Sequence, residues 1–170
     1  VEAGRPDTIT KEKLVALREQ GISRISINPQ SLSDQVLRNI GRRHTAQDVA
    51  DAFKLAQQLG FSNFNADLIV GLPGDDLESF RHTLNGVIDL GASNVTVHSL
   101  ALKRSARLNA PGGDLSLHSQ SGETAAMMDY SIQRLTEEGF EPYYLYRQTR
   151  MAGNLENTGW AKPGTICRYN

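Results

Sequence analysis

Residues 65–80 have the sequence NADLIVGLPGDDLESF, which indicates one strand, one sharp turn and the start of one helix. The apolar run Leu-Ile-Val at 68–70 ends in a Gly-Leu-Pro-Gly turn, as is typical of a buried parallel strand that reaches a helix through a short loop. Beyond the turn, Asp75 and Glu78 resemble a capping box, and apolar residues then recur at helical spacing. This stretch predicts a strand followed directly by a helix.

The segments on either side continue the alternation of strands and helices. Strand-like residues occupy 1–4, 24–28 and 94–98, and helices are expected after caps at Thr10, Ser33 and Thr45. Such an order places parallel strands in one sheet and joins them by helices. The sequence therefore predicts an α/β fold, which is either a barrel or a doubly wound sheet.

The last third of the chain has a different pattern. Residues 103–120 contain Pro-Gly-Gly and little periodicity, which predicts a loop. A helix is predicted over about 123–138, and residues 141–146 indicate an outer or added strand. We therefore divide the chain into a barrel part at 1–102 and a loop, helix and added-strand region at 103–170.

The composition excludes several classes of function. Lysine plus arginine (18) nearly balances aspartate plus glutamate (19), so neither a nucleic-acid-binding surface nor an acidic interaction tail is indicated. The single cysteine, Cys167, excludes a disulfide framework and a multi-cysteine metal site within this chain and fits a reducing, cytoplasmic setting. No apolar run approaches the roughly 20 residues that span a bilayer. We expect a small-molecule partner, with no nucleic acid and no membrane.

Polar side chains are expected where the strands end. Ligands of parallel α/β proteins bind at that edge, because helix amino ends and loop amides converge there. The candidates are Glu2, Gln30 and Asp67, with Arg42 shortly after the strand of Gln30 and backbone groups at 99–101. Two carboxylates, an amide and a guanidinium suit a ligand that carries hydroxyls, an ammonium and a carboxylate.

Each candidate also has a purely structural interpretation. A neighbouring amide can satisfy the strand carboxylate of Asp67, while Glu2 can be a solvated side chain and Gln30 and Arg42 parts of ordinary loops. The four histidines lack metal-ligand spacing and are interpreted as structural or exposed. The turn at 71–74 lacks the lysine and spacing of a phosphate-binding loop.

Several separated motifs resemble one protein family in the same order. They are RISINPQS at 24–31, RNIGR at 38–42, NADLIVGLPG at 65–74 and SLA at 99–101. Together they resemble the oxygen-independent coproporphyrinogen III oxidase (coproporphyrinogen dehydrogenase) family of radical S-adenosylmethionine (SAM) enzymes. The segments YYLYRQ at 143–148 and AGNLENTGWAKPG at 152–164 are most similar to its Bacillus and Clostridium type.

The resemblance implies a partial (β/α) barrel that holds SAM against a [4Fe–4S] cluster, and an electron donor as partner. The implied reaction is radical oxidative decarboxylation of propionate side chains of coproporphyrinogen III, or a related porphyrin, to vinyl groups in haem biosynthesis. The resemblance matches Glu2, Gln30, Arg42 and Asp67 to side chains that contact SAM, and Ala101 to a backbone contact. Arg42 suits the methionine carboxylate. The side chains of Glu2, Gln30 and Asp67 suit ribose hydroxyls or the ammonium.

The resemblance leaves the catalytic residues unknown and the reaction open. Relatives of the family include haem chaperones without oxidase activity, and other radical SAM enzymes act on other substrates. The family's Cys-x3-Cys-x2-Cys loop, which binds the cluster, and its glycine-rich turn are absent from this sequence, and Cys167 alone cannot hold a cluster. We therefore expect this chain to be an inactive piece of a longer protein whose cluster-binding part precedes Val1.

Overall fold

The structure is a computed structural model that describes residues 1–100, 120–146 and 156–166. Its strands are β1 (Glu2–Gly4), β2 (Arg24–Ile27), β3 (Asn63–Val70), β4 (Asn94–Ser99), β5 (Glu141–Tyr146) and β6 (Asn157–Ala161). Its helices are the 3₁₀ turn η1 (Pro6–Thr8), α1 (Lys11–Glu19), α2 (Asp34–Asn39), α3 (Ala46–Gln58), α4 (Leu77–Asp89) and α5 (Gln120–Glu137). None of these helices combines the length and hydropathy needed to cross a membrane.

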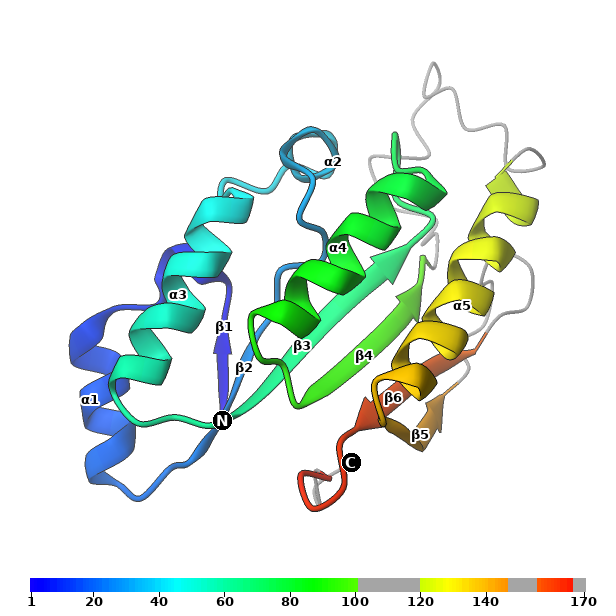
Figure 1. The fold of residues 1–170 in the computed structure, drawn as a ribbon. Coiled ribbons are helices and arrows are strands. Elements are labelled where there is room, and N and C mark those ends of the chain that lie inside the picture. Colours follow the sequence, from blue (N-terminus) through cyan, green and yellow to red (C-terminus); the bar gives the residue numbers. More distant parts are fainter. Residues whose placement is uncertain (101–119, 147–155, 167–170) are drawn as a thin grey trace.

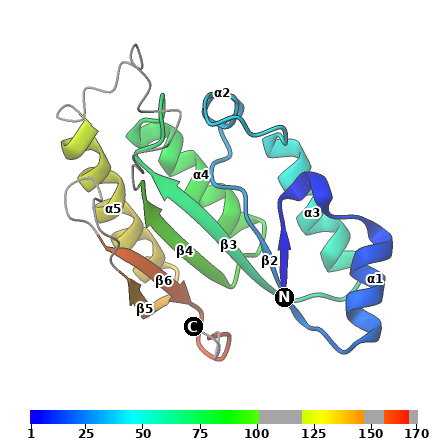
Figure 2. The same ribbon diagram turned by 180° about the vertical axis from the view of Figure 1, so that it is seen from behind.

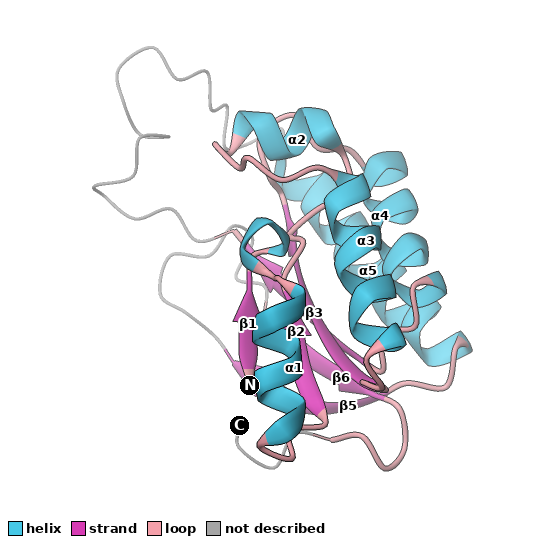
Figure 3. Cartoon of the chain, turned by 90° about the vertical axis from the view of Figure 1, so that its left-hand side faces the viewer, coloured by secondary structure: helices cyan, strands magenta, loops and turns pink. Residues whose placement is uncertain are grey.

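The strands form one sheet in the order β1-β2-β3-β4-β6-β5. The first four strands are parallel, while β6 runs antiparallel to both of its neighbours. Helices α3, α4 and α5 cover one face, and no described helix covers the other (Figures 1 and 3). Helices on a single face are the arrangement of a (β/α) barrel, because a doubly wound sheet is covered on both faces. This confirms the predicted α/β fold of partial-barrel type.

The core lies between the sheet and the helices. On β3, Phe64, Ala66, Leu68 and Val70 are all at most 2% exposed and point toward the helices. The ring of Phe53, on α3, contacts that of Phe64 with centroids 5.2 Å apart. Full burial of each large apolar side chain stabilises the fold by about 1.5–3 kcal/mol. The apolar run recognised in the sequence is therefore the centre of the core.

The helix caps agree with the sequence except at α4. Thr10 and Ser33 accept a backbone hydrogen bond as predicted, and Thr45 forms a capping box with Asp48. At α4 the prediction of Asp75 as the cap is wrong, because Asp76 accepts the hydrogen bond from the backbone nitrogen of Ser79 at 2.7 Å. The backbone N–H of Asp75 instead donates to the carbonyl of Leu72 and closes the turn, so the helix begins one residue later.

In the last third, β5 lies at the edge of the sheet, as predicted for residues 141–146. Helix α5 begins at Gln120, three residues before the predicted start, and residues 103–119 of the predicted loop lie outside the described residues. Strand β6 was not predicted. It pairs with β4 on one side and β5 on the other, so both parts of the chain share one sheet, and the division at residue 102 stays a prediction.

The Gly-Leu-Pro-Gly turn joins β3 to α4 and packs against α2 and α5. Gly71 and Gly74 both have positive φ, which side chains with a Cβ disfavour. A Cβ on Gly71 would lie 2.9 Å from the hydroxyl oxygen of Thr124, on α5, and one on Gly74 would lie 2.5 Å from Nδ2 of Asn39, just inside the end of α2. That Asn39 nitrogen donates to the carbonyl of Pro73 at 2.9 Å. The turn is therefore packed closely on both sides.

We expect Gly74→Ala to lower the free energy of unfolding by about 1–2 kcal/mol, the cost of a left-handed residue with a Cβ. The displaced Asn39 amide would also weaken its hydrogen bond to Pro73. Chemical denaturation followed by circular dichroism measures the change. Gly122→Ala is the control, because Gly122 lies in α5 with open space around it and alanine favours a helix. Equal stability of the Gly74 variant and the wild type would contradict the close packing of this turn.

Candidate functional site

Figure 2 shows the sheet from the face that no described helix covers. Successive side chains of a strand point to opposite faces, so the residues that alternate with the buried apolar ones of β3 lie here. Asn63, Asn65 and Asp67 are the polar ones among them, and register places Asp67 beside Thr96 of β4. His98 follows two residues further along β4. A polar row therefore crosses the two central parallel strands.

Asp67 is held by its neighbours on this row. Its Oδ1 accepts a hydrogen bond from Nδ2 of Asn65 at 2.9 Å and lies 3.9 Å from Nε2 of His98. The hydroxyl of Thr96 in turn donates to Oδ1 of Asn65 at 3.4 Å, which orients the Asn65 amide. No hydrogen bond from another described residue engages Oδ2 of Asp67, and the side chain is 25% exposed. One carboxylate oxygen is thus fixed and the other can accept from a ligand.

The surroundings keep this carboxylate charged. Partial burial is the largest single influence and would raise the pKa of Asp67. The His98 imidazole, the Asn65 amide and the Thr96 hydroxyl together outweigh burial, so the pKa of Asp67 lies below its ordinary value. A charged, half-buried carboxylate suits an ammonium or hydroxyl group of a ligand.

Gln30 lies next to Asp67 through the backbone. Its N–H donates to the carbonyl of Asp67 at 3.0 Å, and its own carbonyl accepts from the N–H of Ile69 at 3.1 Å. Gln30 is also the one non-glycine residue of the described chain with positive φ, at 68°. Such a backbone is held only where the surrounding structure enforces it. The loop after β2 is therefore fixed against β3 at Asp67.

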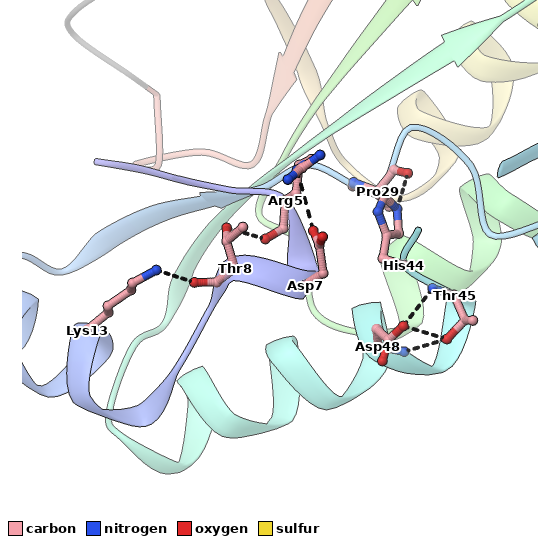
Figure 4. Close-up of polar contacts among 8 residues, drawn as sticks. All are labelled: Arg5, Asp7, Thr8, Lys13, Pro29, His44, Thr45 and Asp48. Atoms are coloured by element: carbon pink, nitrogen blue, oxygen red, sulfur yellow. Dashed lines mark hydrogen bonds and ion pairs between the residues drawn. The ribbon is translucent and has the colours of Figure 1, made fainter. Parts of the chain in front are cut away.

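Arg42 lies on the loop between α2 and α3. Its N–H donates to the carbonyl of Leu37 at 2.8 Å, and its half-buried side chain has no ion pair with another described residue. Two residues later, Nε2 of the buried His44 lies 3.1 Å from the carbonyl oxygen of Pro29 (Figure 4). This contact joins the loop of Arg42 to the loop of Gln30.

The structure corrects the expected places of two candidates. Glu2 is the first residue of β1, not at its carboxyl end, and its Oε1 accepts from Nδ2 of Asn28 at 3.1 Å. Asp67 lies inside β3, which continues to Val70, so it belongs to the sheet face and not to the strand end. Ala101 lies outside the described residues.

The structure thus joins Gln30 directly to Asp67, and it links Glu2 and Arg42 to neighbouring segments. Sequence reasoning missed three further polar residues near Asp67, which are Asn65, Thr96 and His98, and it missed Asn28 beside Glu2. The polar residues at every second position of 63–67 were the available signal for Asn65.

Comparisons with known proteins agree with this arrangement. Residues 3–86 match the Radical SAM superfamily. The chain is 44% identical, over its whole length, to the oxygen-independent coproporphyrinogen-III oxidase-like protein HemZ of Bacillus subtilis and covers 34% of that protein. It is 35% identical, again over its whole length, to the heme chaperone HemW of the same organism and covers 42% of it. The chain therefore spans about a third to two fifths of these relatives.

A solved structure has the same fold. Coproporphyrinogen III oxidase (HemN) from Escherichia coli, a radical SAM enzyme, superposes with a TM-score of 0.72 over 96% of this chain and 35% of the other, at 23% identity. The fold and the family match place this chain in the radical SAM superfamily. Within it, the chain belongs with the oxygen-independent coproporphyrinogen III oxidase-like proteins.

Membership of the superfamily implies SAM and a [4Fe–4S] cluster. The polar groups around Asp67, together with the guanidinium of Arg42, which has no ion pair with another described residue, fit the hydroxyls, ammonium and carboxylate of SAM. The described residues do not fit a cluster, because they contain no group of three histidine, cysteine or acidic side chains that could hold a metal. Cys167 lies outside the described part.

The lowered pKa of Asp67 predicts a dependence of stability on pH. A carboxyl group whose pKa is lower in the folded state stabilises the fold above its unfolded value, near 3.8, and this stabilisation is lost as the pH falls through the folded value. Asp67→Asn keeps an acceptor for Asn65 but cannot titrate. We expect its unfolding free energy to fall less steeply than that of the wild type below about pH 4. Urea titrations at pH values from about 2.5 to about 7 measure the unfolding free energy of both proteins. Parallel curves would contradict the prediction.

Proposed function

We propose that this chain forms the SAM-binding part of an oxygen-independent coproporphyrinogen III oxidase-like enzyme. The observation that carries the proposal is the charged, oriented carboxylate of Asp67 on the helix-free face, in a chain 44% identical to HemZ. The backbone contact of Gln30 to Asp67 supports one ligand reaching both residues. The carboxylate, amide and guanidinium groups of these residues match the functional groups that SAM offers.

Each residue would hold a different part of SAM. Arg42 can pair with the methionine carboxylate in a bidentate way, because its guanidinium is free of ion pairs with described residues. Asp67 offers Oδ2 to a hydroxyl or to the ammonium, while Asn65 and His98 hold its other oxygen. Gln30 and Glu2 supply an amide and a second carboxylate from neighbouring segments, and we retain Ala101 as a backbone contact.

The chemistry that SAM supplies in this family is hydrogen abstraction from the substrate. The proposed substrate is coproporphyrinogen III or a related porphyrin, whose propionate side chains would lose carbon dioxide and become vinyl groups, with an external electron donor as partner. The residues of this chain bind and orient; we assign none of them to the abstraction itself.

A second function is a haem chaperone on the same scaffold. The 35% identity with the heme chaperone HemW over the whole chain favours it. The two functions differ in their products: one yields a decarboxylated porphyrinogen, whereas the other yields a protein with bound haem. Another substrate for the same SAM chemistry is the remaining alternative.

We expect Asp67→Ala and Arg42→Ala, each made in the full-length protein with its cluster reconstituted, to weaken SAM binding by roughly 10- to 100-fold. Each variant removes at least one charge-assisted hydrogen bond, and one such bond contributes about 1.5–3 kcal/mol. SAM cleavage, followed anaerobically as 5′-deoxyadenosine, should fall accordingly, while the iron content stays unchanged.

The controls are Arg43→Ala and Asp89→Ala, which remove exposed side chains of the same charge. Protoporphyrinogen IX formed by the wild type supports the oxidase. Haem binding without decarboxylation favours the chaperone, and cleavage of SAM without either favours another substrate. Unchanged SAM binding in the Asp67 and Arg42 variants would refute the assignment of the site to these residues.

A further inference from the structure

His44 is a buried histidine, and only one of its two ring nitrogens has a hydrogen-bond partner among the described residues. The residue is 3% exposed, and its Nε2 lies 3.1 Å from the carbonyl oxygen of Pro29 (Figure 4). A carbonyl oxygen only accepts, so Nε2 carries the proton and donates it. Nδ1 is buried and has no hydrogen-bond partner among the described residues. Since an unpaired buried nitrogen is unfavourable, packing alone would favour a hydrocarbon side chain of similar size.

The hydrogen bond from His44 holds one end of a particular peptide group. The carbonyl of Pro29 and the N–H of Gln30 belong to the same planar unit. The N–H end of that unit donates to the carbonyl of Asp67 at 3.0 Å. Both ends are therefore fixed, one by His44 and the other by β3. Fixing this plane sets the φ angle of Gln30, which is 68° and would otherwise relax to a negative value.

The same side chain also fixes the loop that carries Arg42. This loop is held at its start by the hydrogen bond from Arg42 N–H to Leu37, and at its end by the capping box of Thr45 and Asp48. His44 lies between these two points and reaches across to the loop after β2 (Figure 4). One imidazole therefore sets the relative position of two loops, each of which bears a proposed SAM contact.

We propose that His44 is a positioning residue, which orients the Pro29–Gln30 peptide and so places Gln30 and Arg42 for SAM. This inference rests on the proposed function. His44 does not touch the ligand; it acts through the two loops. The side chain matters for its directional hydrogen bond, so a residue that donates from the same place should replace it, and an apolar residue of equal size should not.

The test compares His44→Leu with His44→Gln in the full-length protein. Leucine fills the volume without a donor, whereas the glutamine Nε2 can take the place of the histidine Nε2. We expect His44→Leu to weaken SAM binding at least about tenfold, while kcat at saturating SAM changes less than about twofold. His44→Gln should bind SAM within about threefold of the wild type. His82→Leu, at an exposed position of α4, is the matched control.

A second measurement follows the peptide itself. Amide hydrogen exchange at Gln30 and Ile69 should become at least about tenfold faster in His44→Leu, relative to Ser93, whose N–H donates to Phe64 away from this loop.

If the leucine variant does not fold, wild-type exchange and affinity in His44→Gln are the expected result, and their loss overturns the proposal. Equal defects in both variants, or no defect in either, overturn it too. A wild type that binds no SAM refutes the proposed function alone, since the exchange rates still decide the role of His44.

Discussion

The register of β3 against β4 is the constraint on which the rest of the structure depends. Six residue pairs join the strands, from Asn65 opposite Asn94 to Val70 opposite Ser99. Because side chains alternate, this register sends Leu68 into the core and Asp67 to the helix-free face. A slip of one residue would exchange the two sets and bury the charge among the helices. The apolar packing that stabilises the fold therefore also fixes the polar face.

The loops extend this order beyond the regular strands. Strand β2 ends at Ile27, yet Gln30 still bridges to Leu68 of β3, so the sheet continues through a residue with left-handed backbone. Buried contacts hold that conformation: Leu32 N–H donates to the hydroxyl of Thr83 on α4 at 3.0 Å, and His44 holds the preceding carbonyl. The candidate site thus consists partly of sheet residues and partly of a loop, whose conformation is held by contacts with α4 and with His44.

The sequence predicted local features well and long-range ones poorly. The strand, turn and helix over 65–80 and the helix cap at Thr45 depend on neighbouring residues, so they could be predicted. The choice of Asp76 over Asp75 as a cap depends on one turn hydrogen bond, which the sequence does not reveal. Strand β6 is buried only because β4 and β5 flank it, and its residues Asn-Thr-Gly-Trp-Ala show no strand periodicity. The pairing of His98 with Asp67 likewise requires the register.

The polar face has a physical requirement that a packed apolar face does not have. In a closed barrel the interior is filled by layers of side chains, and polar groups placed there must find partners. Here the hydroxyl of Thr96 donates to the amide of Asn65, which in turn donates to the carboxylate of Asp67. These hydrogen bonds allow Asn65 to be buried, with 7% of the residue exposed. The chain of hydrogen bonds ends at Asp67, where one oxygen has no hydrogen bond to another described residue and 25% of the side chain is open. A network that satisfies all but its last acceptor is stable without a ligand and still ready to bind one.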